Sequence, residues 1–230
     1  MPAKARRLVI DDDIRSLAQR PRCAEPGDAR IFHDSTFDYV AFAAAHNLPA
    51  RIDAGELDEV WVYAPPYGRV WQPAPDMAGP GFTPYGSHGH WVVNDDGDWM
   101  FVSSYHAQWG WATYHYGRWA WTDYYGWVWV PGTAWAPSWV EWRYGGGYVG
   151  WAPMGPGYVT AYAPAYTFVE TAHFVAGDCA RHRLPPERVN MAYASTVSVH
   201  EQGGHGGARW NAGPRVEQVE RELGAPIRRV

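Results

Sequence analysis

Cysteine is scarce in this chain of 230 residues, which contains only Cys23 and Cys179. The two residues lie far apart and form no C-x-x-C pair, so a metal or redox motif built on cysteine is excluded. Two interpretations stay open. Either both thiols are unpaired, or they form one long-range disulfide, which would require an oxidising compartment.

Long apolar runs and clusters of basic residues are also missing. No run reaches about eighteen apolar residues, so we expect no membrane-spanning segment. Asp11, Asp12 and Asp13 stand where the apolar core of a secretion signal would lie, and we expect no signal peptide in the chain as written. The formal net charge is −5. Because nucleic-acid binding requires clustered Lys and Arg, we expect no nucleic-acid partner.

A recognisable hydrolase motif is lacking as well. The sequence has no G-x-S-x-G nucleophile elbow, although a triad can be assembled on paper from Ser103, Ser104, His106 and His115. Ser, His and Asp are common enough that such groups arise by chance. We therefore expect no catalytic residues in this set.

A metal site is a second possibility that the pattern does not favour. His88 and His90 would share one face of a strand, and Asp95, Asp96 and Asp98 follow closely. Residues 94–98, however, read Asn-Asp-Asp-Gly-Asp, which is typical of a tight hairpin turn. We expect neither a metal nor another cofactor.

Tryptophan, by contrast, is abundant and concentrated. Of fifteen Trp residues, twelve lie within residues 91–151. Three pairs have a small or aliphatic residue between two Trp, at positions 109–111, 119–121 and 127–129. Successive side chains of a strand alternate between its faces, so both Trp of each pair would point the same way. We interpret each pair as one rung of an aromatic ladder.

A short theme combining a turn, a strand and a proline recurs through this region. Residues 67–73 read Tyr-Gly-Arg-Val-Trp-Gln-Pro, and residues 125–131 read Tyr-Gly-Trp-Val-Trp-Val-Pro. Gly permits the turn, the β-forming run makes a strand, and Pro ends it because it cannot donate a hydrogen bond to a neighbouring strand. The fold class predicted is mainly β, an antiparallel meander of short Trp-rich strands in a small barrel or sandwich.

Three segments are predicted along the chain. Residues 1–59 form a partly helical N-terminal segment with a helix at about 37–46, and residues 60–155 form the β-domain, entered by a strand at 59–63. Residues 156–230 form an extension, with a strand at 195–199 and a polar connection at 181–188. An amphipathic helix at about 214–223 closes it, with Pro214 at its first position and Gly224 ending it.

The candidate site is an aromatic platform on one hairpin. Two strands would gather four indoles on one side, flanked by tyrosines that include Tyr124. The opposite arrangement, with the indoles buried and Ala120, Val128 and Val130 outside, stays open. We also expect Arg118 and Arg143 to stack on the aromatic rungs. The predicted ligand-binding residues are Trp119, Trp121, Trp127, Trp129, Tyr116, Tyr125 and Arg118.

Several motifs occur in an order that resembles the bacterial Trp- and Tyr-rich family DUF6600. They are Trp-Gly-Trp-Ala-Thr-Tyr-His-Tyr-Gly-Arg-Trp at 109–119, Gly-Trp-Val-Trp-Val-Pro-Gly at 126–132, Trp-Val-Glu-Trp-Arg at 139–143, Gly-Trp-Ala-Pro at 150–153 and Asn-Ala-Gly-Pro at 211–214. The resemblance covers about residues 67–230. It implies an exported envelope protein, with no established activity and no catalytic residues to carry over.

Together these observations favour a non-enzymatic cell-envelope or surface module, with a structural or binding role through its aromatic surface. Its ligand would be a glycan, stacked on exposed rings, or a protein such as a Pro-rich segment. The alternative is a glycan-binding or glycan-active protein of the hydrolase type. That alternative requires two carboxyl groups flanking one cleft, with Glu141 and Asp123 as candidates.

Overall fold

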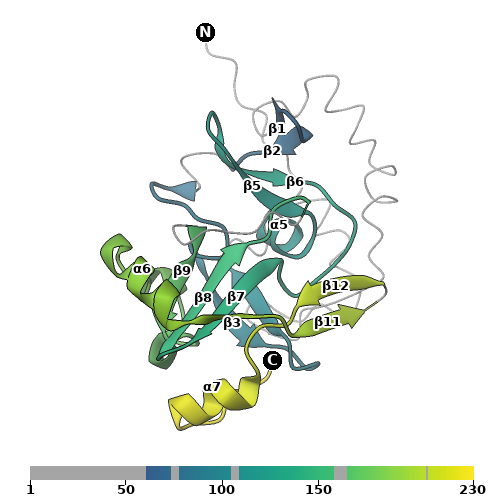
Figure 1. The fold of residues 1–230 in the computed structure, drawn as a ribbon. Coiled ribbons are helices and arrows are strands. Elements are labelled where there is room, and N and C mark those ends of the chain that lie inside the picture. The colour runs from purple at the N-terminus through teal and green to yellow at the C-terminus, as the bar shows by residue number, and fades with distance from the viewer. Residues whose placement is uncertain (1–60, 74–77, 105–108, 158–164, 206) are drawn as a thin grey trace.

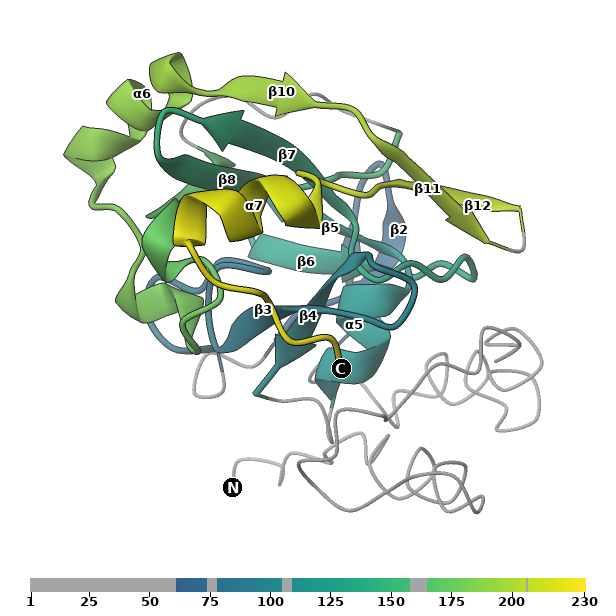
Figure 2. The ribbon, with the colours of Figure 1, turned by 90° about the horizontal axis from the view of Figure 1, so that it is seen from below.

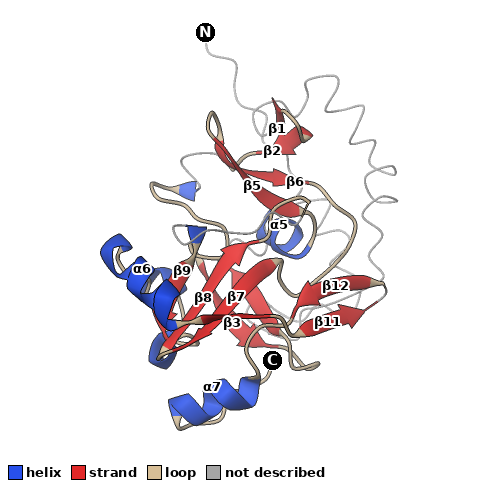
Figure 3. Ribbon diagram, in the orientation of Figure 1, coloured by secondary structure: helices blue, strands red, loops and turns tan. Residues whose placement is uncertain are grey.

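The computed structural model describes residues 61–73, 78–104, 109–157, 165–205 and 207–230 (Figure 1). Cys23, the helix predicted at about 37–46 and the segment 1–59 lie outside these residues. Antiparallel strands dominate the described part (Figure 3), which confirms the prediction of a mainly β fold.

The strands are β1 (Trp61–Ala64), β2 (Gly68–Trp71), β3 (Gly89–Val93), β4 (Trp99–Ser103), β5 (Arg118–Thr122), β6 (Gly126–Val130), β7 (Val140–Gly145), β8 (Tyr148–Pro153), β9 (Thr167–Glu170), β10 (Val197–Val199), β11 (Gln202–His205) and β12 (Ala208–Asn211). The α-helices are α5 (Trp111–His115), α6 (Pro186–Ser195) and α7 (Val216–Leu223). Two 3-10 turns, η3 (Thr171–His173) and η4 (Cys179–Arg181), complete the set.

These strands build two four-stranded sheets, ordered β1-β2-β6-β5 and β10-β7-β8-β9, and two separate hairpins, β3-β4 and β11-β12. The first sheet does not follow chain order, because β2 pairs directly with β6. The hairpin β3-β4 and helix α5 come between these two strands in sequence. Trp91 of β3 packs against Trp142 and Trp151 of the second sheet, while α5 contacts both β4 and β5 (Figure 1). Among the described strands neither sheet closes on itself, so the small barrel considered from the sequence is not formed.

The repeated turn-strand-proline theme accounts for two strands of the first sheet. Gly68 and Gly126 open β2 and β6 with φ angles of 78° and 70°, which residues with a Cβ rarely adopt. Pro131 follows β6 immediately and ends its pairing. The theme therefore locates these strands correctly from sequence alone.

One of the three Trp pairs was interpreted wrongly. Trp109-Gly110-Trp111 is not a strand rung, because it leads into α5. Residues two apart on a helix point in nearly opposite directions. Accordingly Trp109 is buried, with its ring 5.0 Å from that of Trp71, while Trp111 is half-buried against Tyr116.

The C-terminal residues are held against the second sheet. β9 pairs with β8 and β10 pairs with β7, so strands on both sides of residue 155 share one sheet. Helix α6 contacts β8 and β9, and α7 lies across the end of this sheet, beside η3 (Figure 2). The Tyr144 hydroxyl fixes α7 by donating to Glu222 Oε2 at 2.5 Å.

Helix α7 confirms the predicted amphipathic helix, with Val216 and Val219 buried and Gly224 ending it at a φ of 70°. Its N-cap is Arg215, so Pro214 precedes the helix instead of opening it. Helix α6 is a correction, because the sequence analysis predicts a polar connection at 181–188 and no helix that begins within it. Pro186 occupies its first turn, where a missing N–H costs nothing.

Indoles are prominent among the largest side chains of the core. The largest fully buried side chains include Trp91, Trp99, Trp119, Trp139, Trp142 and Trp151. Their rings meet tilted or edge to face, with centroids 4.5 Å apart for Trp91 and Trp142 and 5.4 Å apart for Trp91 and Trp151. Such arrangements place the positive edge of one ring against the negative face of another.

Buried indoles also bind backbone carbonyls with their N–H groups. Four consecutive carbonyls at the end of α5 accept hydrogen bonds from aromatic side chains elsewhere in the chain. The bonds are Trp119 Nε1 to Thr113 O at 2.9 Å, Tyr85 Oη to Tyr114 O at 2.9 Å, Trp139 Nε1 to His115 O at 3.0 Å and Trp129 Nε1 to Tyr116 O at 2.8 Å. The last carbonyls of a helix have no partner within it, so these side chains complete the short helix.

Glycines permit aromatic rings to lie directly on the sheets. Gly150 pairs with Phe168, and a Cβ at Gly150 would lie 2.1 to 2.7 Å from three ring atoms of that phenylalanine. The same relation holds between Gly203 and its cross-strand partner Trp210. Close approach of rings to the backbone is thus part of how this fold packs.

Candidate aromatic site

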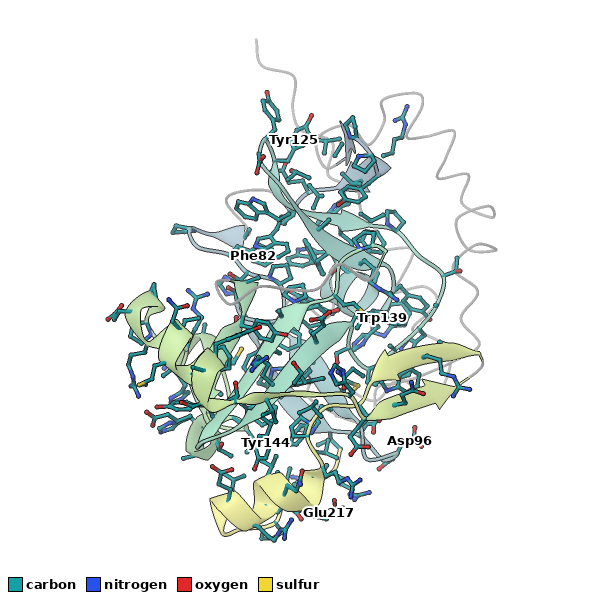
Figure 4. All side chains as sticks on the ribbon, viewed as in Figure 1. Phe82, Asp96, Tyr125, Trp139, Tyr144 and Glu217 are labelled. Carbon is teal, nitrogen blue, oxygen red and sulfur yellow. The ribbon has the colours of Figure 1, made fainter. Side chains whose placement is uncertain are left out.

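The candidate site lies on the hairpin formed by β5 and β6. Its register pairs Trp119 with Trp129 and Trp121 with Trp127. The four indoles therefore share one face of the hairpin, as the Trp-x-Trp spacing predicts. Tyr125 lies at the outer end of the hairpin, while Trp139 lies in the middle of the molecule (Figure 4).

The two Trp pairs differ sharply in exposure. Trp119 and Trp129 are only 1% and 3% exposed, and Tyr116 beside them is 1% exposed. Trp121, by contrast, is 60% exposed. The prediction of one partly exposed platform that includes Trp119, Trp129 and Tyr116 is therefore wrong. The inner half of the hairpin enters the core because its indole N–H groups bind the end of α5.

The alternative arrangement is correct for the buried Trp119 and Trp129 but wrong for the small residues, since Ala120 and Val128 are buried and Val130 is half-buried. Ala120 and Val128 are buried on the opposite face, in a cluster with Ala64 and Val70 of the neighbouring strands. Both faces of the inner hairpin are thus covered. Only its outer end carries exposed rings.

We call this outer end the aromatic tip and define it as Trp121, Tyr124, Tyr125 and Trp127. Tyr124 is 87% exposed, and Tyr125 and Trp127 are half-buried. The rings form two edge-to-face pairs. The centroids of Trp121 and Trp127 are 5.6 Å apart, and those of Tyr124 and Tyr125 are 4.7 Å apart.

Side-chain hydrogen bonds hold the turn that carries the aromatic tip. Thr122 Oγ1 donates to Gly126 O at 3.2 Å and accepts from Tyr125 N at 3.1 Å. From the neighbouring strand segment, Gln72 Nε2 donates to Tyr125 O at 2.7 Å. The rings are therefore presented on a preorganised turn, which lowers the entropy lost when a ligand binds.

At the inner end of the hairpin, Arg118 stacks as predicted. Its Cζ lies 3.2 Å from the ring centroid of Trp139, and its Nη1 donates to Gly117 O at 2.8 Å. Arg143 also stacks, although on Tyr193 of α6 and not on an indole, with Cζ 3.8 Å from the ring centroid. The predicted ligand-binding residue Arg118 is thus engaged within the fold, away from the aromatic tip.

Replacing Arg118 with lysine should lower the free energy of unfolding by about 0.5–1.5 kcal/mol, because the charge is kept but the planar stacking on Trp139 is lost. Chemical denaturation measures the change. Arg181→Lys is the control, since that side chain is exposed and should tolerate the change. Equal stability of Arg118→Lys and the unaltered protein would contradict the stacking role.

The carboxylates considered for hydrolysis lie on different elements. Asp123 is exposed in the turn between β5 and β6, whereas Glu141 lies on β7 of the other sheet. Glu141 Oε2 accepts a hydrogen bond from Tyr166 Oη at 3.3 Å. Burial, together with the neighbouring Glu141 carboxylate, raises the pKa of Tyr166 above its ordinary value. Tyr166 therefore remains a neutral donor to Glu141.

Several residues considered for a metal site or a catalytic triad lie within hydrogen-bonding distance of backbone groups of the fold. Residues 94–98 form the tight turn between β3 and β4, with Asn94 N donating to Asp98 O at 3.0 Å. His88 Nε2 lies 3.1 Å from Ala78 O, and His115 Nδ1 lies 3.1 Å from Ala136 O. Within the described ranges, no group of three or more His, Cys, Asp or Glu is arranged to hold a metal ion. His106 lies outside those ranges.

Cys179 is a buried free thiol, and burial raises its pKa to about 12. Its Sγ donates to Tyr85 O at 3.6 Å. A thiol kept protonated in this way is a poor nucleophile.

Among the described helices, none is long and apolar enough to cross a membrane.

Sequence reasoning misses Gln72 as a contributor to the site and gives Tyr124 only a flanking place. Gln72 supports the turn across the sheet, which only the pairing of β2 with β6 makes possible. Tyr124 was named as a flanking residue only, yet it is the most exposed large aromatic side chain described. Its place at the centre of a five-residue turn, between Thr122 and Gly126, was the available signal.

Comparison with known proteins supports the family resemblance that the motifs indicate, over part of the residue range predicted for it. A family model described as a family of unknown function, DUF6600, matches residues 56–158. This range contains β1 to β8 and the whole aromatic tip, and it does not reach the tail motif at 211–214. No curated protein and no solved structure matches the chain. Over residues 56–158, the chain therefore resembles the family DUF6600.

Proposed function

We propose that this protein is a non-enzymatic binding module of the bacterial cell envelope or cell surface, and that the aromatic tip holds its ligand. One observation carries the proposal. In a domain whose indoles are mostly buried, Trp121 and Tyr124 are 60% and 87% exposed on a preorganised turn. Exposed aromatic side chains of this kind are typical of recognition surfaces.

The remaining aromatic residues have a structural role in this proposal. Trp119, Trp129 and Trp139 complete α5 through their N–H groups and are shielded from solvent. They fix the inner end of the hairpin, so that the tip stands on a rigid base. The envelope location rests on the family resemblance.

The proposal is tested by capture from an envelope extract of the native organism on the immobilised full chain. We expect the unaltered protein to retain a component that the double variant Trp121→Ala, Tyr124→Ala does not retain. Val197→Ala is the matched control, because Val197 is also an exposed apolar side chain and lies on β10. Equal capture by the double variant, with its near-ultraviolet circular dichroism intact, would refute a binding role for the tip.

A further inference from the structure

We infer that the ligand of the aromatic tip is a neutral glycan. This inference rests on the proposed function and adds the chemical class of the ligand. It follows from the charges around the tip, from the orientation of its rings and from the polar groups beside them.

The charge of the hairpin disfavours anionic ligands. Between Trp119 and Trp129, Asp123 is the one charged residue, and it is exposed at the turn. Arg118 stands at the other end of the strand, stacked on Trp139. A phosphate, sulfate or uronate group would thus meet a carboxylate and no cation from the hairpin. An anionic membrane surface is disfavoured for the same reason.

The ring orientations argue against a Pro-rich peptide. Polyproline helices dock in grooves lined by aromatic side chains. In the aromatic tip the paired rings cross at 79° for Trp121 and Trp127 and at 84° for Tyr124 and Tyr125. Within each pair the two rings therefore do not form parallel walls of a groove.

Trp121 instead offers an exposed indole beside polar groups. Its ring atoms Cζ3 and Cη2 would lie 3.7 Å or less from a Cβ at Gly126, so the indole rests against the backbone of the facing strand. Trp121 is 60% exposed, although its ring also meets that of Trp127 edge to face. Such a surface suits the C–H groups of a sugar ring, and the adjacent Asp123 carboxylate and Tyr124 hydroxyl can accept hydrogen bonds from sugar hydroxyls.

The test uses affinity electrophoresis of the full chain in gels containing neutral polysaccharides, namely dextran, galactomannan, laminarin and soluble starch. Parallel gels contain the anionic polysaccharides alginate and heparin, and a flotation assay uses phosphatidylcholine vesicles. We expect retardation by at least one neutral polysaccharide, unchanged at high ionic strength because no ion pair is involved. Trp121→Ala should weaken that binding by about tenfold or more, as expected for a residue central to an interface.

Two variants make the result specific. Val197→Ala should bind as the unaltered protein does. Asp123→Asn should weaken binding to the neutral polysaccharide without creating binding to alginate or heparin. Retardation by anionic polysaccharides only, flotation with vesicles, or no retardation by any neutral polysaccharide would overturn the inference. If Trp121 and Tyr124 were still required for capture from the envelope extract, the proposed binding function would stand, and only the inference of a neutral glycan would fail.

Discussion

Replacing Trp119 with alanine should lower the free energy of unfolding by about 3–5 kcal/mol, as expected for truncation of a large core side chain. The indole packs against Phe82 and Trp71, with ring centroids 5.6 and 6.1 Å away. Its N–H also binds Thr113 O at 2.9 Å. The substitution would leave a cavity and an unpaired carbonyl at the end of α5. Urea denaturation measures the loss.

The control is Trp121→Ala, two residues further along the same strand and on the same face. Trp121 is largely exposed, so its removal should change the free energy of unfolding by less than about 1 kcal/mol. The pair of variants separates structural from exposed indoles within one hairpin. Similar losses of unfolding free energy for both variants would contradict the assignment of Trp119 to the core and Trp121 to the exposed surface.

Tyr85→Phe should lower the free energy of unfolding by roughly 2–4 kcal/mol, because two buried backbone groups would lose their partner. The Tyr85 hydroxyl donates to Tyr114 O at 2.9 Å and accepts from Trp139 N at 3.2 Å. Burial raises the pKa of Tyr85, so the hydroxyl remains a donor across the physiological range. Thermal and urea unfolding both measure the effect.

Tyr124→Phe is the matched control for Tyr85→Phe, since it removes the same hydroxyl from an exposed ring. It should leave the free energy of unfolding nearly unchanged. A stability of Tyr85→Phe equal to that of the control would mean that the two buried backbone groups find other partners.

Local signals made part of this fold predictable from the sequence. Three features each depend on only a few adjacent residues: the turn at residues 94–98, the glycines at the start of β2 and β6, and the end of α7 at Gly224. The shared face of the Trp-x-Trp pairs in β5 and β6 follows from strand geometry. For these features, residue chemistry and spacing are sufficient.

Other features depend on contacts between distant segments. The Trp-x-Trp pattern reads the same at residues 109–111 as in β5, although one lies at a helix and the other in a strand. Likewise, Trp119 and Trp121 are indistinguishable by spacing, and their different exposure depends on where α5 and its carbonyls lie. Helix α6 was obscured because only Ala192 in it is buried, which leaves little apolar periodicity.

The indole N–H bonds to backbone carbonyls also bear on the rate of folding. Trp99 Nε1 binds Pro214 O, Trp142 Nε1 binds Asn211 O and Trp151 Nε1 binds Tyr85 O, across 115, 69 and 66 residues of chain. Contacts between residues far apart in sequence form only after a large loss of chain entropy, and domains rich in them fold in milliseconds to seconds. This protein should accordingly fold slowly for its size, and the indole N–H groups of Trp99 and Trp142 gain their partners only once residues 211–214 are in place.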